Sequence, residues 1–180
     1  MQLAAVRQAE AVRQEVSREV LNRQAEHILD TYGDHILRYA YTYLHNQSDA
    51  EEVLQDTLLQ FLKTAPVFEN AAHEKAWLLR VAGNLSKSRI QYNSIRKTDE
   101  LQEELAAENR EDLSFLWDAV RALPDKYREV VHLFYYEGYS TREIAALLNR
   151  REVTVRSDLH RGRQQLKNIL KEAYDFEETV

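Results

Sequence analysis

Glycine and proline are scarce in this chain, and their scarcity limits its fold more than any other feature. Only 4 glycines and 2 prolines occur among 180 residues, so few positions favour the turn conformations that separate short strands. Alternation of apolar and polar residues at a period of two, the pattern of a half-buried strand, is hard to find anywhere. We therefore predict an all-α fold, with a length that suits one domain or two small ones.

Apolar residues at helical spacing place the expected helices in two groups. The first group comprises a charged helical stretch over residues 1–26, a helix over 28–44 with Leu29 facing inward, one from a Ser48 N-cap to about residue 63, and a fourth that contains Trp77. The second group comprises helices over 113–123 and 125–136 and a final helical pair. We expect two small helical domains, with these boundaries: N-terminal helical extension 1–25, first domain 26–97, acidic linker 98–112, second domain 113–171 and acidic tail 172–180.

The segment Tyr139–Arg163 has the pattern of a helix-turn-helix that reads DNA. Ser140 and Glu143 have the spacing of a capping box, and Asn149 tolerates the left-handed conformation that a tight turn needs. In the second helix, four residues recur at helical spacing and are expected to be buried: Val155, Leu159, Gly162 and Leu166. A neighbouring face carries basic residues that could meet phosphate: Arg156, His160, Arg163 and Lys167.

Charge is strongly segregated along the chain. The formal net charge of −6 argues at first against a nucleic-acid partner, but the total conceals two basic segments. Lys75–Thr98 carries +6 and Arg150–Lys167 carries +4, whereas Asp99–Asp112 between them carries −6. This pattern favours two basic surfaces that grip one polyanion, with the acidic spacer repelled from it.

The sequence lacks the motifs typical of enzymes and metal sites. The chain has no cysteine, and it has neither an HExxH motif nor a Walker loop. Asp49, Glu52 and Asp56 share one helix face, which favours a solvated or protein-binding surface over a metal site. We expect a protein that is not an enzyme and needs no metal or cofactor. No apolar run is long enough to span a membrane, so we expect a soluble, cytoplasmic protein without membrane insertion.

The helix around Trp77 could hold single-stranded nucleic acid. Asn84, Lys87 and Arg89 follow Trp77 on a segment without acidic residues, and an aromatic ring beside amide and cationic groups can stack a base and bind its backbone. Trp77 could equally be an ordinary core residue. Phosphate contact is the favoured interpretation for Lys87 and Arg89.

Four ordered motifs resemble the sigma-70 family of bacterial RNA polymerase initiation factors, specifically the minimal extracytoplasmic-function (ECF, group 4) type with only regions two and four. The resemblance covers about residues 26–170. The motifs are DAEEVLQDTLLQF (Asp49–Phe61), AWLLRVAGNLSKSR (Ala76–Arg89), LPDKYREVVHLFYYEGYSTREIAALL (Leu123–Leu148) and TVRSDLHRGRQQL (Thr154–Leu166).

The resemblance implies a protein that binds core RNA polymerase, brings it to promoter DNA and helps to open the duplex. The implied polymerase contacts are Glu51, Glu52, Gln55 and Asp56. The implied contacts to the minus-ten element in region 2 are Trp77, Asn84, Lys87 and Arg89. The implied contacts to the minus-thirty-five element in region 4 are Arg156, Ser157, His160 and Arg161. An anti-sigma factor is a further implied partner.

Several positions depart from the family pattern. The family often has Asp and Arg where this chain has Ser88 and Gln91, and often Gly, Arg and Ala where it has Val153, Asp158 and Gly162. Arg151 stands where a Ser or Thr cap is common. The departures after Arg151 predict weak or unusual reading of the minus-thirty-five element. Two other functions are considered: a stand-alone helix-turn-helix regulator that binds a palindrome as a dimer, and a sigma-like protein that sequesters a regulator.

Overall fold

The computed structural model describes the backbone of residues 2–96 and 114–174 and the side chains of residues 17–93 and 116–172. These residues form seven helices and no strand, which confirms the all-α prediction. The helices are α1 (Gln2–Leu44), α2 (Gln47–Thr64), α3 (Ala71–Arg96), α4 (Ser114–Arg121), α5 (Asp125–Tyr135), α6 (Thr141–Leu148) and α7 (Glu152–Tyr174). The predicted acidic linker over 98–112 lies outside the described residues, as does the end of the predicted tail.

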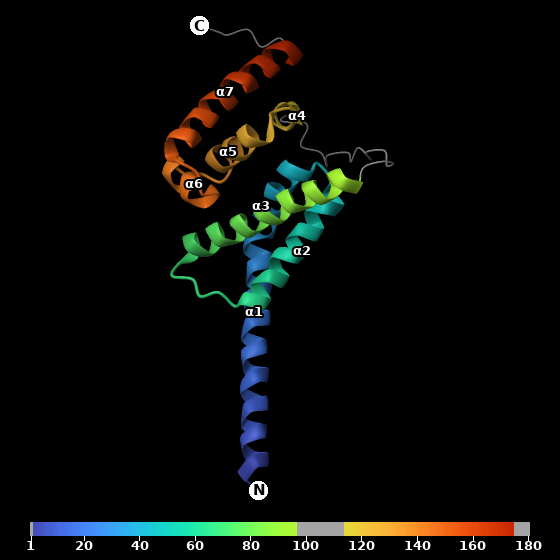
Figure 1. Cartoon of the computed structure of the whole chain (residues 1–180), viewed down its shortest axis with the longest axis vertical. Coiled ribbons are helices and arrows are strands. Elements are labelled where there is room, and N and C mark those ends of the chain that lie inside the picture. Colours follow the sequence, from blue (N-terminus) through green and yellow to red (C-terminus); the bar gives the residue numbers. More distant parts are fainter. Residues whose placement is uncertain (1, 97–113, 175–180) are drawn as a thin grey trace.

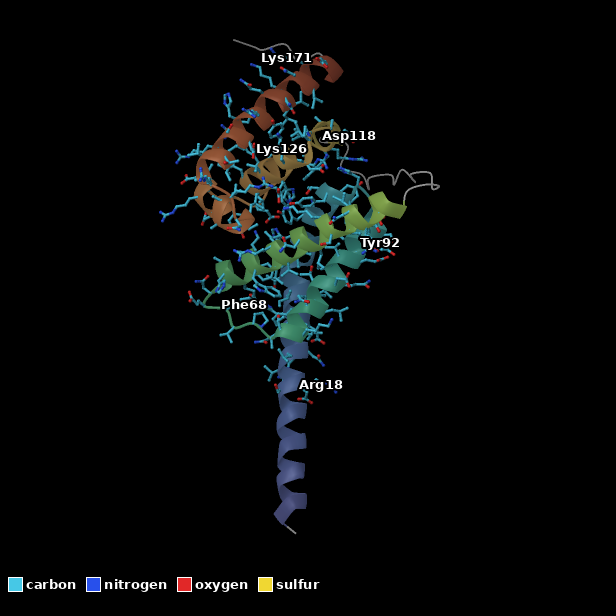
Figure 2. The ribbon with its side chains drawn as sticks, in the orientation of Figure 1. Arg18, Phe68, Tyr92, Asp118, Lys126 and Lys171 are labelled. Carbon is cyan, nitrogen blue, oxygen red and sulfur yellow. The ribbon has the colours of Figure 1, made fainter. Side chains whose placement is uncertain are left out.

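Helix α1 is one continuous helix, whereas the sequence analysis predicts two. Residues 1–32 contain neither glycine nor proline, so nothing in the sequence stops the helix near residue 26. The N-terminal part of α1 projects away from the rest of the molecule, and Arg18 lies on this projecting part (Figures 1 and 2). The predicted N-terminal extension is therefore continuous with the first helix of the body.

Helices α1, α2 and α3 pack together as the first unit, with α2 and α3 lying against the C-terminal half of α1 (Figure 1). Ile28, Ile36 and Tyr39 of α1 are fully buried. Leu29, which is predicted to face inward, is 45% exposed. Its neighbour Ile28 occupies the inward position, because a shift of one residue turns a helical side chain by about 100°.

Helix α2 begins two residues before its predicted start. Asn46, not Ser48, is the N-cap, and its side chain accepts a hydrogen bond from the Asp49 amide at 2.9 Å. The left-handed conformation of His45 (φ 53°) turns the chain directly ahead of this cap. At the other end, Ala65 adopts a left-handed C-cap (φ 40°), and the following Pro66 is a residue that disfavours helix continuation.

Helices α4 to α7 form the second unit. Pro124 is the N-cap of α5, and Gly138 adopts φ 76° after that helix ends. The predicted capping box of Ser140 and Glu143 is present at the start of α6, and Asn149 adopts φ 52° at its end. The two helices of the helix-turn-helix are therefore α6 and α7. Helix α7 continues to Tyr174, beyond the predicted domain end at residue 171.

Candidate nucleic-acid and polymerase interfaces

The exposed face of α7 carries the residues expected to meet the minus-thirty-five element. Arg156, His160 and Arg161 are exposed and Ser157 is partly exposed. The opposite face of α7 is buried as predicted, with Val155 at 0% and Leu159 at 4% exposure. Helix α7 packs on α5 and α6 through this buried face, which leaves the predicted DNA-binding face open.

One hydrogen bond joins the first turn of α7 to α6, and a second holds the same carboxylate within α7. The Thr141 hydroxyl donates to Glu152 Oε1 at 3.0 Å, and Arg156 donates to the same oxygen at 2.7 Å. These two donors lower the pKa of the Glu152 carboxyl. The start of the recognition helix is thus held to the preceding helix by a side chain as well as by the turn.

Arg161 lies at the edge of the same surface. Its guanidinium sits beside the Tyr127 hydroxyl of α5 and lowers the pKa of that phenol. Arg163, one turn below His160, lies 5.4 Å from the ring centre of Phe134 and 5.5 Å from that of Tyr135. Both arginines are therefore oriented by aromatic residues of the second unit.

Asp158 faces inward and is not part of the predicted DNA-binding face. It is 8% exposed and lies 3.8 Å from Arg150. Where the family often has an arginine, this chain therefore has a buried carboxylate that lies beside Arg150. Because the position faces inward in this chain, its change from the family's arginine does not alter the charge of the predicted DNA-binding face.

Gly162 allows α7 to approach α5 closely. A Cβ at this position would lie 2.9 Å from Val131 Cγ2 and 3.3 Å from Tyr127 Cβ. Distances this short require a neighbour to move, and Val131 is itself buried at 4% exposure. The family often has alanine here, and glycine in this chain lets α5 and α7 pack closely. Residue 162 faces α5 and not the predicted DNA-binding face.

Replacing Gly162 by alanine is expected to destabilise the chain by about 1 kcal/mol, because the overpacking cost of about 1–3 kcal/mol exceeds the gain in helix propensity of about 1 kcal/mol. In a Val131→Ala background the 2.9 Å contact is removed and only the 3.3 Å approach to Tyr127 Cβ remains, so the same change is expected to destabilise clearly less. Urea denaturation of the four proteins in this cycle measures the coupling. An equal effect of Gly162→Ala in both backgrounds would contradict this packing explanation.

The predicted polymerase contacts all lie exposed on one helix, α2. Glu51, Glu52, Gln55 and Asp56 point away from the buried face that contains Val53. Glu51 accepts a hydrogen bond from Gln47 at 2.9 Å. Asp56 has no ion-pair or hydrogen-bond partner among residues 17–93 and 116–172. This face is available to another protein.

Arg89, a predicted minus-ten contact, joins α3 to the acidic face of α2. It donates to Asp49 at 3.0 Å and also binds Glu52. These carboxylates raise the pKa of the guanidinium against the opposing effect of its burial. The structure therefore brings together one residue predicted for DNA and one predicted for polymerase, which the sequence analysis assigns to separate surfaces.

Trp77 is half-buried and packs among aromatic residues at the start of α3. Its ring centre lies 6.5 Å from that of Phe61 and 5.7 Å from that of Phe68. Phe68 belongs to the loop between α2 and α3, at the opposite end of α3 from Tyr92 (Figure 2). Asn84 is exposed further along α3. Trp77 thus contributes to packing while retaining an exposed part.

Lys87, another predicted minus-ten contact, is bound by the second unit. Glu129 of α5 is 2% exposed, and its Oε1 accepts from Lys87 Nζ at 2.7 Å and from the Tyr39 hydroxyl at 3.3 Å, as well as from Tyr43. Its Oε2 accepts from Arg150 at 2.8 Å. Burial and the Glu129 charge raise the pKa values of Tyr39 and Tyr43 well above their usual range. Glu129 therefore holds α1 and α3 against the second unit.

A second buried carboxylate, Glu137, crosses the same boundary. Its side chain is fully buried and accepts from Lys75 at 2.7 Å and from His35 at 2.9 Å, with His132 at 3.4 Å. Burial alone would raise the pKa of Glu137, but His132 and Lys75 outweigh it and hold the pKa at about 2. The carboxylate is consequently charged across the physiological pH range.

Arg128 completes this boundary at the far end of α5. It donates to the backbone carbonyls of Thr42 and Leu123 and contacts His45. Burial, followed by the charge of Arg128, lowers the pKa of His45 to about 4. The two units are thus joined by charged groups that are removed from water, for which desolvation opposes the electrostatic gain.

The sequence analysis did not identify Glu129 or Glu137 as interface residues. Glu129 lies four residues before the buried Leu133, a helical spacing that could have marked it as a charged residue on an inward face. That spacing predicts burial, but it does not identify Lys87 or Tyr43 as partners. These residues lie 42 and 86 positions away in the sequence.

None of the described helices is long and apolar enough to cross a membrane. Within the same residues, no group of three or more His, Asp and Glu side chains is arranged to hold a metal ion.

Two family models match this chain. "Sigma-70 region 2" matches residues 28–95, and "Sigma-70, region 4" matches residues 116–166. The first match covers α2, α3 and the C-terminal part of α1, and the second covers the helix-turn-helix and α5. A stand-alone helix-turn-helix regulator is not favoured, because the region 2 match lies outside the helix-turn-helix. A sequestering protein is not favoured either, because the curated relatives are sigma factors.

Curated relatives give the same family. The chain is 31% identical over 158 residues to the ECF RNA polymerase sigma factor SigE of Mycolicibacterium smegmatis. This match covers 81% of this chain and 61% of SigE. It is also 31% identical to the RNA polymerase sigma-E factor of Streptomyces coelicolor, over 81% of this chain and 85% of the relative. The chain thus spans less than two thirds of SigE but most of the Streptomyces protein.

A solved structure has a similar fold. The sigma factor RpoE of Bartonella quintana, crystallised with the anti-sigma factor NepR, superposes with a TM-score of 0.68 at 24% identity, covering 82% of this chain and 97% of that one. On the two sigma-70 region matches and on sigma factor relatives at 31% identity, the chain belongs to the sigma-70 family of RNA polymerase sigma factors, in its extracytoplasmic-function group.

Proposed function

We propose that this sigma factor directs initiation through faces on three of its helices. The acidic face of α2 binds core RNA polymerase through Glu51, Glu52, Gln55 and Asp56. The minus-ten element is held by α3 through Trp77, Asn84, Lys87 and Arg89. The minus-thirty-five element is read by α7 through Arg156, Ser157, His160 and Arg161. The protein is not an enzyme and acts in the cytoplasm, where polymerase and promoter DNA meet.

The observation that carries this proposal is the open face of α7 on a capped helix-turn-helix. Arg156, His160 and Arg161 are exposed there, while the opposite face packs into the core. A recognition helix enters the major groove with its N-terminal residues toward the base edges. Its exposed cations supply phosphate contacts and its polar groups supply base contacts.

The two DNA contacts are expected to act together with polymerase. Separating a duplex costs about 1.4 kcal/mol per stacked step, and a captured base returns about 1–3 kcal/mol. One small helical unit with a few such contacts cannot open several base pairs alone. We therefore expect the free chain to bind promoters poorly, and polymerase with the second DNA contact to supply the remainder.

Lys87 gives a structural reason for the same expectation. Its ammonium group is bound to Glu129 at 2.7 Å, which occupies one of its donors and offsets its charge in this arrangement. Separation of the two units is therefore part of the proposed DNA-binding state. An anti-sigma factor is a proposed partner, supported by the similar fold of a sigma factor crystallised with one.

Reconstitution with core polymerase tests the proposal. The chain is expected to co-purify with core polymerase and to support initiation at defined start sites on genomic templates, which sequencing of the transcripts would map. Failure both to bind core polymerase and to support specific initiation would overturn it.

Arg156→Ala combined with Arg161→Ala is expected to weaken promoter binding by the holoenzyme about tenfold or more, because base and phosphate contacts are lost together. The slope of log affinity against log salt should fall by nearly 2, since each phosphate contact contributes about 0.9. Binding is measured by fluorescence anisotropy at several salt concentrations. The matched control is Arg18→Ala with Arg23→Ala, which removes the same charge from α1. Equal effects of the two pairs would remove α7 from the proposed interface.

A further inference from the structure

Val153 is an apolar residue on the surface of the recognition helix. It is 76% exposed in the first turn of α7 and does not belong to the hydrophobic core. A β-branched residue lowers helix propensity slightly, and an exposed valine contributes little burial energy. Neither local structure nor packing therefore accounts for a valine at this position.

Helical spacing places Val153 within the proposed DNA-binding face. Arg156, Ser157 and His160 follow it at three, four and seven residues, so these four side chains share one side of α7. The buried residues Val155 and Leu159 lie on the other side. Val153 is thus the N-terminal member of the face on which the proposed base and phosphate contacts lie.

The position of Val153 is well fixed. The adjacent Glu152 is bound by Thr141 of α6 at 3.0 Å and by Arg156 at 2.7 Å, which anchors the first turn of α7. Valine in a helix strongly prefers one side-chain rotamer. Its two methyl groups are therefore presented to the surface in a constant direction.

The chemistry of the major groove offers one apolar partner for such a residue. Each base pair presents hydrogen-bonding groups there, but only thymine adds a methyl group, at its C5 position. The N-terminal residues of a recognition helix are those that reach base edges. A valine side chain offers a phosphate neither a charge nor a hydrogen-bond donor. With a thymine methyl group it can form an apolar contact that excludes water.

We propose that Val153 contacts the C5-methyl group of a thymine and so selects thymine at one position of the minus-thirty-five element. This inference rests on the proposed role of α7 in promoter recognition. Val153, where the family often has glycine, would then determine sequence preference and not weaken the reading of the minus-thirty-five element. The proposed preference is for a methyl group and not for a hydrogen-bonding pattern. Its effect can therefore be measured separately from the effect of the hydrogen bonds to the bases.

Replacement of single thymines by deoxyuridine tests this contact, because it removes only the methyl group. Holoenzyme formed from the full chain first selects its preferred duplex from a randomised pool. Each thymine of that duplex is then replaced in turn. We expect one replacement to weaken wild-type binding about fourfold, the effect of losing one buried methyl contact. Holoenzyme with Val153→Ala should bind the thymine and deoxyuridine duplexes equally.

Val20→Ala serves as the control, because Val20 is also an exposed valine within a helix, at 45% exposure on α1. That variant should retain the fourfold preference for thymine. The inference is overturned if no replacement affects the wild-type holoenzyme, or if the preference persists in Val153→Ala. A holoenzyme that selects no sequence overturns both this inference and the proposed function, whereas a selected sequence without a methyl effect overturns the inference alone.

Discussion

Replacing Glu129 by glutamine is expected to weaken the contact between the two helical units by about 2 kcal/mol. The carboxylate is 2% exposed and bound to Lys87, Arg150, Tyr39 and Tyr43. An amide keeps the shape and can still accept a hydrogen bond, but it removes the countercharge of two cations. Breaking a fully buried ion pair costs about 3–5 kcal/mol. Since the Lys87 side chain is 44% exposed, solvent screening reduces this cost.

Distance measurements between two spin labels check this expectation. The chain contains no cysteine, so Gln60→Cys on α2 and Gln164→Cys on α7 supply two unique labelling sites at exposed positions. Glu129→Gln should lengthen or broaden the distance distribution relative to the parent. Glu26→Gln, an exposed glutamate of α1, should leave the distribution unchanged. An unchanged distribution in Glu129→Gln with retained helicity would show that this carboxylate does not hold the units together.

The same variant should increase the affinity of the free chain for single-stranded DNA, because Lys87 becomes available to phosphate. The added change Lys87→Ala should abolish that gain. If Glu129→Gln increases the affinity equally with and without Lys87, then the gain comes from the loss of negative charge alone. The double variant therefore separates release of a particular lysine from a general electrostatic effect.

Reversing the charge of Asp56 is expected to reduce the affinity for core polymerase about 30-fold. Asp56 is exposed on α2 and has no partner in the described part of the chain, so its loss should leave the fold intact. A like-charge contact across an interface costs several kcal/mol, and about 2 kcal/mol corresponds to this factor. The affinity of Asp56→Lys for core polymerase is measured by competition between labelled and unlabelled chains.

Asp30→Lys is the matched control, because it makes the same charge change at an exposed position of α1. Both variants alter the formal net charge of −6 by the same two units. A comparable loss in both would indicate that overall charge, and not the α2 face, determines the affinity. Glu52 is less suitable for this test, because its ion pair with Arg89 also joins α2 to α3.

The sequence predicted features that depend on residues close together in the chain. The capping box of Ser140 and Glu143, the left-handed Asn149 and the buried face of α7 were all predicted and confirmed. Each is decided by interactions within about two helical turns. The predictions that were wrong also have local causes. Asn46 replaces Ser48 as the cap of α2, and Leu29 is exposed because its neighbour Ile28 faces the core.

The roles of single charged residues were less predictable. Lys87 and Arg89 stand in a segment without acidic residues, which favours phosphate contact in the sequence. In the structure they bind Glu129, Asp49 and Glu52, which come from other helices. Spacing within one helix gives the face on which a charge lies. It does not give the element that packs against that face.

An all-helical chain, a helix-turn-helix and a likeness to the sigma-70 family could all be predicted from the sequence, because helical periodicity, capping and ordered motifs are local patterns. The joining of the two units by Glu129 and Glu137, the inward position of Asp158 and the close approach of α7 to α5 at Gly162 could be seen only in the folded chain. These features depend on groups that are distant in sequence, and the energy of a charge or a close contact is fixed by its neighbours in space.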